Sequence, residues 1–390
     1  IPKRDWSSDV CSSDLPFGFV MPTRIEFGVG VLSKLPAVLR ELPGKRILII
    51  TDRVIGSLGW FREILDLLGR EGFTMMVFDG VEGNPKDTNV SAAAETARSF
   101  NAAGLLAVGG GSPIDCAKVA SICAVKGGAP REYEDRARIG RGLLPIIAIP
   151  TTAGTGSEVT FGAVITDTAQ RFKFTVKSPE MAPRVALLDP QLTVSMPPSL
   201  TAATGMDALT HAIEAYSSRA AEPISDACAL YAAELIAGNL PAACRDGNDL
   251  EARSAVLLGS LIAGIAFSHS DVGAVHCIAE AIGGMYDIPH GVGNAVCLPV
   301  VMERCREACE PRYARLAEAM GRRGGTAADA VSMVADLARE VGLPPFSSFS
   351  IPPADFPVIA EKSAANGSNA DNIPVLSAED YLRLLEELSG

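Results

Sequence analysis

The first half of the chain alternates between two hydrophobic patterns, and this alternation constrains its fold more than any other feature. Short runs rich in aliphatic and β-branched residues predict strands, and stretches with the 3.6-residue periodicity of a helix lie between them. Such alternation predicts parallel βαβ units with helices on both faces of the sheet. The predicted strands are Arg24–Phe27, Arg46–Thr51, Thr74–Asp79, Leu105–Val108 and Leu144–Ile149. The predicted helices between them are Leu32–Leu42, Trp60–Glu71, Val90–Asn101 and Pro113–Val125.

The pattern changes after Asp189-Pro190. From Pro198 onward the chain is rich in Ala and Leu, has helical periodicity and contains almost no β-branched runs. A chain of 390 residues is also too long for one ordinary core. We therefore predict an α/β domain with a parallel, Rossmann-like sheet over residues 16–195 and an all-α domain over residues 196–390. The helices predicted in the second domain are Leu200–Tyr216, Ile224–Ala237, Leu250–Phe267, Ala274–Gly283, Tyr313–Met320 and Ala378–Leu388.

The first fifteen residues do not have the pattern of a folded segment. Residues 7–11 (SSDVC) are followed by residues 12–15 (SSDL), which form a near-identical tandem repeat without apolar periodicity. This segment resembles translated sequencing-adapter DNA, so we interpret residues 1–15 as non-native and exclude them from the predicted fold. We expect the native chain to start near residues 17–21.

Composition and charge argue against several classes of function. The formal net charge of −12 repels nucleic acids and anionic membranes. No apolar run reaches the roughly 18 residues that a membrane span needs. The nine cysteines form no CxxC pair and follow no secretory signal, which is typical of reduced thiols in the cytoplasm. We therefore expect a soluble cytoplasmic protein without a nucleic-acid or membrane partner.

A glycine-rich turn follows one of the predicted strands. The strand Leu105–Val108 runs into Gly109–Ser112, and Pro113 suits the first turn of the helix that follows. This arrangement can bind a pyrophosphate, because glycines let the backbone approach and the unpaired N–H groups of a helix N-terminus favour anions. The spacing differs from the common GxGxxG pattern, so a plain glycine-rich turn is an equal alternative.

Two further segments follow predicted strands, at the end where open α/β sheets bind their ligands. Pro150–Ser157 crowds hydroxyl groups and glycines after the strand that ends at Ile149. The alternative is a Thr-rich loop that caps the next element. Asp52 follows the strand Arg46–Thr51, where a carboxylate can bind an adenine ribose and repel a 2′-phosphate. This position predicts NAD, although Asp52 could equally cap a helix and Arg53 leaves NADP open.

Three of the four histidines of the chain point to a metal site. Asp207 and His211 are four residues apart in a predicted helix and therefore lie on one helix face. His276 falls in a second predicted helix, and His290 follows in a loop or at a helix start. One carboxylate and three imidazoles suit Fe²⁺ or Zn²⁺. Any one of these histidines alone is more often an ordinary helix residue, but the joint pattern favours a metal site.

Four motifs, in this order along the chain, resemble the iron-containing (group III) alcohol dehydrogenases. They are Gly109–Asp115, Pro150–Thr160 (PTTAGTGSEVT), Gly205–Tyr216 (GMDALTHAIEAY) and the pair His276 and His290. The family includes lactaldehyde–propanediol oxidoreductases and 1,3-propanediol dehydrogenases. The resemblance implies the dehydroquinate synthase-like fold: an N-terminal dinucleotide-binding α/β domain, an α-helical C-terminal domain and a site in the cleft between them. It also implies a homodimer.

The resemblance implies roles for individual side chains. The metal, Fe²⁺ with Zn²⁺ as the alternative, would be held by Asp207, His211, His276 and His290. The pyrophosphate would lie on the glycine turn, and hydroxyls with one lysine would line the nicotinamide. The cofactor-binding residues implied in this way, together with Asp52, are Asn84, Gly110, Gly111, Ser112, Asp115, Thr151, Thr152, Thr155 and Lys173.

Two positions depart from the family pattern. Many relatives carry a second histidine one helical turn after the first ligand of the second helix, where this chain has Glu280. This chain also has His269 where relatives usually have Asn. We treat both as candidate catalytic residues. Glu280 is four residues after His276 and could receive the alcohol proton through water or hold a polar substrate tail, or it could be an ordinary surface glutamate.

These features together predict an NAD(P)-dependent alcohol dehydrogenase. Hydride would pass between nicotinamide C4 and the carbinol carbon of a small alcohol or aldehyde, while the metal polarises the substrate oxygen. Two alternatives share the scaffold. One is a non-redox, nucleotide- and metal-dependent enzyme like dehydroquinate synthase, and the other is a non-catalytic protein that binds NAD or metal.

Overall fold

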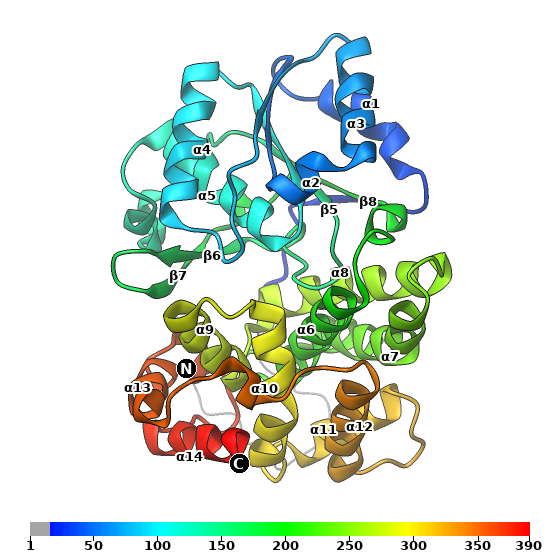
Figure 1. The fold of residues 1–390 in the computed structure, drawn as a ribbon, viewed down its shortest axis with the longest axis vertical. Helices are drawn as coiled ribbons and strands as arrows, with labels where there is room; N and C mark the ends of the chain where they lie inside the picture. Colours follow the sequence, from blue (N-terminus) through cyan, green and yellow to red (C-terminus); the bar gives the residue numbers. More distant parts are fainter. Residues whose placement is uncertain (1–15) are drawn as a thin grey trace. The chain divides into compact units, whose positions relative to one another are not determined.

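The computed structural model describes residues 16–390, so the adapter-like segment 1–15 lies outside the described residues. The chain divides into two compact units, which Figure 1 draws in sequence colours. An α/β unit consists of residues 21–152 and 156–195. A helical unit consists of residues 196–390, together with residues 153–155 and the described residues 16–20.

The α/β unit is built on a six-stranded sheet with the strand order β1-β8-β5-β4-β2-β3. Every neighbouring pair in this sheet is parallel, which confirms the predicted sheet type. The strands are β1 (Arg24–Phe27), β2 (Arg46–Ile50), β3 (Thr74–Phe78), β4 (Gly104–Gly109), β5 (Ile146–Pro150) and β8 (Val185–Leu188). The pairing of β4 with β5 aligns Gly109 with Pro150, so the glycine turn and the hydroxyl-rich loop begin side by side.

Helices cover the sheet and create a hydrophobic core on each face. Alternate residues of β2 enter different cores: Ile47 and Ile49 pack with α1 and α3, whereas Leu48 and Ile50 pack with α4 and α5. Burial on both faces explains why the inner strands are almost continuously apolar. The helices are η1 (Val31–Lys34), α1 (Leu35–Leu39), α2 (Arg53–Ser57), α3 (Gly59–Arg70), α4 (Asp87–Phe100), α5 (Gly111–Lys126), η2 (Pro130–Glu134), η3 (Arg136–Arg138), η4 (Pro179–Met181) and η5 (Pro190–Thr193).

Residues 162–177 form a feature that the sequence pattern did not predict. The strands β6 (Gly162–Asp167) and β7 (Phe172–Lys177) pair as an antiparallel hairpin outside the main sheet. Ala163, Ile165, Phe174 and Val176 of this hairpin are buried in the core that α5 also joins. The hairpin therefore extends the α/β unit beyond simple βαβ repeats.

The helical unit confirms the predicted all-α second half. Its long helices are α6 (Pro198–Ser217), α7 (Pro223–Arg245), α8 (Leu250–Ser270), α9 (Ala274–Tyr286), α10 (His290–Cys305), α11 (Glu310–Ala319), α12 (Ala327–Glu340), α13 (Phe356–Ala364) and α14 (Ala378–Ser389). The short turns η6 (Phe346–Phe349), η7 (Pro353–Asp355) and η8 (Gly367–Ala370) lie between α12 and α14. Helix α6 packs against α7, α8 and α10 and is buried along most of its length. It is thus the central helix of this unit.

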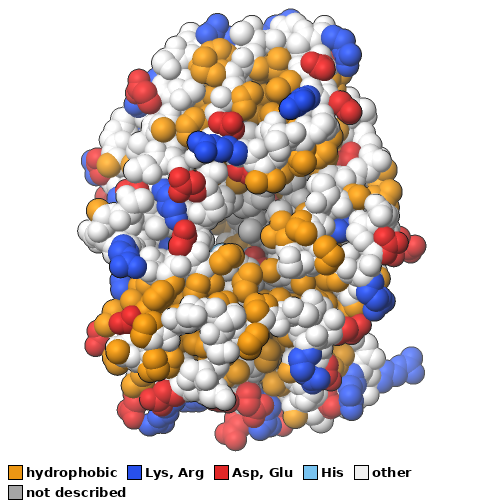
Figure 2. Space-filling view, in the orientation of Figure 1, with side chains coloured by type: hydrophobic (Ala, Val, Ile, Leu, Met, Phe, Trp, Pro, Cys, Tyr) orange, Lys and Arg blue, Asp and Glu red, His pale blue; other side chains and the backbone are white. Residues whose placement is uncertain are grey.

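Two helices, α7 and α8, are long and apolar enough to cross a membrane by length and composition alone. This is weak evidence for a membrane span, because core helices of water-soluble proteins have the same properties. Here both helices pack against α6 and against each other. On the face drawn in Figure 2, acidic and basic side chains are interspersed.

Candidate metal centre

Helix α6 supplies two of the predicted metal ligands. Asp207 and His211 are 1% and 4% exposed and lie one helical turn apart. Close packing fixes this part of the helix, because Gly205 leaves no room for a side chain: a Cβ there would lie 2.3 Å from Leu240 Cδ1 of α7. The Phe267 ring stacks on the His211 ring, with the two ring centroids 4.3 Å apart.

Helices α9 and α10 supply the other two predicted ligands. His276 lies in the first turn of α9 and is 3% exposed, and His290 is the first residue of α10. The ring centroid of His276 lies 4.6 Å from the ring centroid of His211 and 5.2 Å from that of His290. One donor atom from each of these histidines and from Asp207 comes within 4.8 Å of the others. The structure thus brings together the four residues that the sequence singled out.

The tautomer of His276 is fixed by a carboxylate. Its Nδ1 lies 2.5 Å from Glu214 Oε2, and both side chains are buried. A carboxylate only accepts, so Nδ1 carries the proton, and the lone pair that the neutral ring offers to a metal is that of Nε2 on its other side. His276 is therefore oriented as a metal ligand by a group behind it, an arrangement common to metal-binding histidines.

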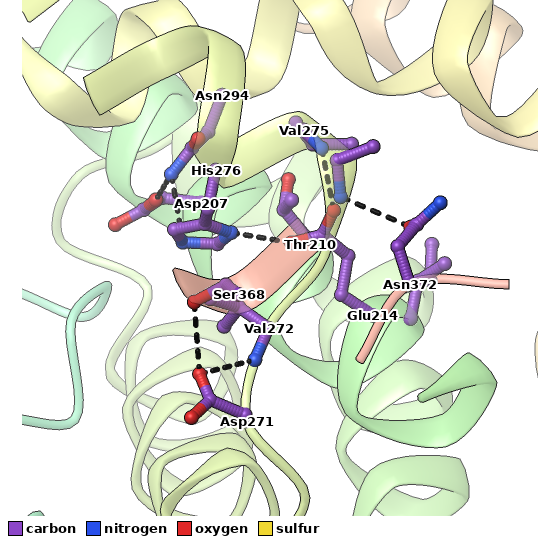
Figure 3. A network of polar contacts seen from close by, with 12 residues as sticks. Asp207, Thr210, Glu214, Asp271, Val272, Val275, His276, Asn294, Ser368 and Asn372 are labelled. Carbon is purple, nitrogen blue, oxygen red and sulfur yellow. Dashed lines mark hydrogen bonds and ion pairs between the residues drawn. The ribbon is translucent and has the colours of Figure 1, made fainter. Parts of the chain in front are cut away.

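Asn294, on α10, faces the same cluster (Figure 3). Its Nδ2 donates to Asp207 Oδ1 at 2.6 Å and lies 3.0 Å from His276 Nε2 and 3.1 Å from His290 Nε2. Three predicted ligands therefore direct acceptor atoms at one point. The buried Nδ1 of His211 and Oδ1 of Asn294 form no hydrogen bond with any described residue.

This donor set fits a divalent transition metal. Three imidazoles and one carboxylate suit Fe²⁺ or Zn²⁺ better than Mg²⁺ or Ca²⁺, which prefer all-oxygen sites. Burial lowers the pKa of His211 to about 4, so this ring is neutral near pH 7, as a metal ligand must be. Burial also disfavours the charged form of His276, but the carboxylates of Glu214, Asp207 and Glu280 together outweigh it and raise the pKa of that ring.

The predicted pyrophosphate site lies at the start of α5. Gly109 has φ of 151°, and a Cβ there would lie 2.6 Å from Pro113 Cγ, so only glycine fits. The N-cap residue Gly110 provides no side-chain cap, and Gly111 and Ser112 form the first turn of the helix. Backbone N–H groups at such a helix end suit an anion.

The hydroxyl-rich loop begins beside this turn. The Thr151 N–H donates to Gly109 O at 3.0 Å, and a Cβ on Gly110 would lie 3.1 Å from Thr152 Oγ1. These contacts bring Gly110 and Thr152 into close proximity. Thr155 belongs to the short stretch 153–155 that clusters with the helical unit.

The remaining predicted cofactor residues have partners within the α/β unit. Lys173 Nζ donates to Asn84 Oδ1 at 2.8 Å, so these two predicted residues contact each other. Asp52 caps α2, because its Oδ1 accepts the Ile55 N–H at 2.9 Å. The capping alternative for Asp52 is thus realised.

Asp115 and Lys118 tie helix α5 to the hydroxyl-rich loop and the residues that follow it. Asp115 accepts from Ser157 Oγ and from the Val164 N–H at 3.0 Å. Lys118 is fully buried, and its Nζ donates to Ser157 Oγ at 2.9 Å and to Thr160 Oγ1 at 2.8 Å. Burial lowers the pKa of Lys118 to about 8. These contacts support a positioning role for Asp115, between α5 and the hydroxyl-rich loop.

The two candidate catalytic residues contact other parts of the helical unit. His269 places Nδ1 2.9 Å from Ile265 O and Nε2 3.0 Å from Val20 O, and the Phe19 ring stacks on it at 4.0 Å. Glu280 accepts from Asn366 Nδ2 at 2.6 Å. Neither belongs to the four-residue cluster. These contacts support structural roles. His269 anchors residues 19–20, and Glu280 anchors the segment before η8.

Sequence reasoning missed three buried polar residues: Glu214, Asn294 and Lys118. The signal for each was helical spacing. Glu214 is two turns after Asp207, Asn294 is one turn after His290, and Lys118 is one turn after Asp115. Each therefore lies on the same helix face as a residue that was predicted, and a search along these faces would have found them.

Comparisons with known proteins agree with this geometry. The sequence model for iron-containing alcohol dehydrogenase matches residues 22–190, and that for the C-terminal part of the Fe-containing alcohol dehydrogenase family matches residues 201–389. A 1,3-propanediol dehydrogenase of Citrobacter freundii is 40% identical over 91% of this chain and 94% of its own length. An NAD-dependent methanol dehydrogenase of Bacillus methanolicus is 34% identical over 94% and 98%. A crystal structure of 1,3-propanediol oxidoreductase aligns with a TM-score of 0.91 at 37% identity, covering 96% of this chain and 100% of that one. The chain therefore belongs to the iron-containing alcohol dehydrogenase family.

Proposed function

We propose that this oxidoreductase interconverts a small alcohol and its carbonyl compound, with a divalent metal at Asp207, His211, His276 and His290 and with NAD(H) as the hydride carrier. The reaction class, oxidation or reduction at a CH–OH group, follows from membership of the family. The observation that carries the metal assignment is the convergence of four donor atoms, three from buried residues and one from a half-buried residue, within 4.8 Å.

A metal bound there supplies a Lewis acid that polarises the oxygen of the substrate. The protein contributes a fixed donor geometry: Glu214 sets the tautomer of His276, and Asn294 holds Asp207. Burial keeps water away from the donors and strengthens their electrostatic effect. Iron is the expected metal by family membership, and zinc can replace it during purification because zinc binds such sites more tightly.

The α/β unit supports the cofactor assignment. The uncapped N-terminus of α5 suits a pyrophosphate, and Thr151 and Thr152 begin the loop beside it. The carboxylate of Asp52 at the end of β2 favours NAD over NADP, because it repels a 2′-phosphate. Hydride chemistry belongs to the nicotinamide, and the protein sets its orientation.

The substrate class that we propose is a small aliphatic alcohol or aldehyde. The similar proteins include dehydrogenases of 1,3-propanediol and of methanol. Both are small, and both react at a primary alcohol. We also infer a cytoplasmic homodimer. Size-exclusion chromatography with light scattering measures the oligomeric state, and a monomer would contradict that part.

The decisive experiment compares His276→Ala with His269→Gln. Both replace a histidine of the helical unit, but only His276 belongs to the cluster. We expect His276→Ala to lose bound metal, measured by elemental analysis, together with NADH-dependent turnover of small aldehydes. We expect His269→Gln to retain its metal. A His276→Ala enzyme with full metal content and turnover would refute the ligand assignment.

The same assays separate the proposed function from both alternatives. An elimination enzyme like dehydroquinate synthase would bind metal and NAD but would not oxidise NADH with any aldehyde of the panel. A non-catalytic scaffold would bind both without any turnover. Steady NADH oxidation that depends on the aldehyde and on the metal is the result that we expect.

A further inference from the structure

The helix that carries His276 begins without a cap of its own. The N-cap residue of α9 is Gly273, which has no side chain to accept the first N–H groups. Two buried side chains from distant segments do so instead (Figure 3). Asn372 Oδ1 accepts the Ala274 N–H at 3.0 Å, and Glu214 Oε1 accepts the Val275 N–H at 2.7 Å.

Gly273 allows this approach. A Cβ at that position would lie 2.6 Å from Asn372 Oδ1 and 3.1 Å from Glu214 Oε1. Any side chain would therefore push these two acceptors away from the helix end. The missing side chain at the N-cap position is therefore what lets the two acceptors reach the first N–H groups of α9.

The two carboxylate oxygens of Glu214 have different partners. Oε1 holds the backbone of α9 at Val275, and Oε2 accepts from Nδ1 of His276, the next residue. One buried carboxylate thus fixes both the position of the helix end and the rotation of the imidazole ring. Glu214 lies on α6, three residues after His211, so the helix that provides two ligands also orients a third.

Asn372 is itself held in place. Its Nδ2 donates to Pro374 O at 2.6 Å, and its backbone oxygen accepts from Arg219 Nε at 3.0 Å. The Arg219 N–H donates to Asp371 O at 2.8 Å. Arg219 lies two residues after the end of α6 at Ser217, so the segment 371–374 is tied to the end of the same helix that carries Glu214.

We propose that Glu214 is a positioning residue for the metal centre and that Asn372 assists it by completing the N-terminus of α9. The proposal rests on the proposed function, because it takes His276 as a metal ligand. A loosened histidine loses orientation and gives a weaker metal bond, and loss of such supporting groups typically lowers metal affinity about 10–100-fold.

Glu222 offers a matched control. It is also a buried glutamate, 4% exposed against 5% for Glu214, and it also caps a helix. Its carboxylate accepts the Ile224 N–H at 2.9 Å and the Ser225 N–H at 2.7 Å at the start of α7. None of its described hydrogen bonds involves one of the four predicted metal ligands. Glu222→Gln therefore reports the cost of altering a buried cap alone.

The experiment measures cobalt affinity by chelator competition, the visible spectrum of the cobalt-loaded protein, and thermal unfolding. We expect Glu214→Gln to bind cobalt about 10–100-fold more weakly than wild type and to have an altered spectrum. We expect Glu222→Gln to lower the melting temperature but to keep wild-type affinity and spectrum. Asn372→Leu, which removes the acceptor of the Ala274 N–H, should also weaken binding relative to Glu222→Gln.

The outcomes separate this inference from the proposed function. If wild type binds cobalt at the cluster and Glu214→Gln matches Glu222→Gln in affinity and spectrum, the positioning role is wrong and the metal site stands. If wild type binds no metal, or if His276→Ala binds it as well as wild type, both are wrong. Should Glu214→Gln not fold, the comparison of Asn372→Leu with Glu222→Gln decides, and equal metal affinities of these two variants would overturn the inference.

Discussion

Replacing Gly205 by alanine tests how tightly the ligand-bearing helix α6 is held. Alanine is the better helix former, so this change in a helix interior usually stabilises a protein by about 0.5–1 kcal/mol. Here the new methyl group would lie 2.3 Å from Leu240 Cδ1, 2.9 Å from Cδ2 and 3.1 Å from Cγ. Leu240 is fully buried, so its side chain has no open space into which it can turn.

The two effects oppose each other, and their magnitudes decide the sign. Overpacking of a well-packed core costs about 1–3 kcal/mol. After subtraction of the gain in helix propensity, the net loss is roughly 1 kcal/mol. For a unit of this size such a loss lowers the melting temperature by about 2–4 °C. Because Asp207 is two residues further along, a displaced α6 should also weaken metal binding.

Gly238 provides the control within the same pair of packed helices. It lies in α7 and is exposed, and a Cβ there would meet nothing within 4 Å. Gly238→Ala should therefore raise the melting temperature, whereas Gly205→Ala should lower it. Circular dichroism at a fixed metal concentration measures both. A Gly205→Ala protein that is as stable as Gly238→Ala would refute the packing argument.

Three other predictions concern cofactor choice, proton handling and acid stability. Asp52→Gly should improve the use of NADP relative to NAD, measured as the ratio of kcat/KM values, and a wild type that already prefers NADP would contradict our interpretation. The glutamine of Glu280→Gln can still accept the hydrogen bond from Asn366, so we expect unchanged metal content and an unchanged pH profile of turnover. A large fall in kcat with a shifted pH optimum would instead show that Glu280 takes part in proton transfer. Hydrogen bonds from Ser377 lower the pKa of Asp380 to about 2, so its contribution to stability is present above the ordinary value of 3.8 and is lost as pH falls towards 2. Asp380→Asn should therefore reduce thermal stability at pH 6, and the difference from wild type should vanish near pH 2.

The parallel sheet could be predicted because its inner strands carry their own signal. Ile47, Leu48, Ile49 and Ile50 are all fully buried, so β2 appears in the sequence as an unbroken apolar run between two helical patterns. Such runs do not depend on knowledge of the partner strand. The predicted strand and the observed one differ by a single residue at the end.

The hairpin β6–β7 could not be predicted with the same argument, because a buried charge interrupts its pattern. Along β7, Lys173 is buried beside Phe174, and Thr175 is exposed. A lysine between two phenylalanines predicts a solvent-facing position, but Asn84 accepts a hydrogen bond from its ammonium group inside the unit. The partner that makes this burial possible is 89 residues away, and local patterning contains no information about it.

The same physical limit separates the ligands from the groups that orient them. Asp207 and His211 could be paired from the sequence because a helix fixes the relation between residues four apart. The contact between Asn372 and Ala274 joins residues 98 positions apart, and it exists only once α6, α9 and the segment before α14 have packed. The pairing of these two ligands can therefore be predicted from local sequence. The groups that orient a ligand depend on tertiary packing. It follows that substitutions near residue 372, far from any ligand in sequence, should affect metal affinity more than substitutions on exposed positions of α9 itself.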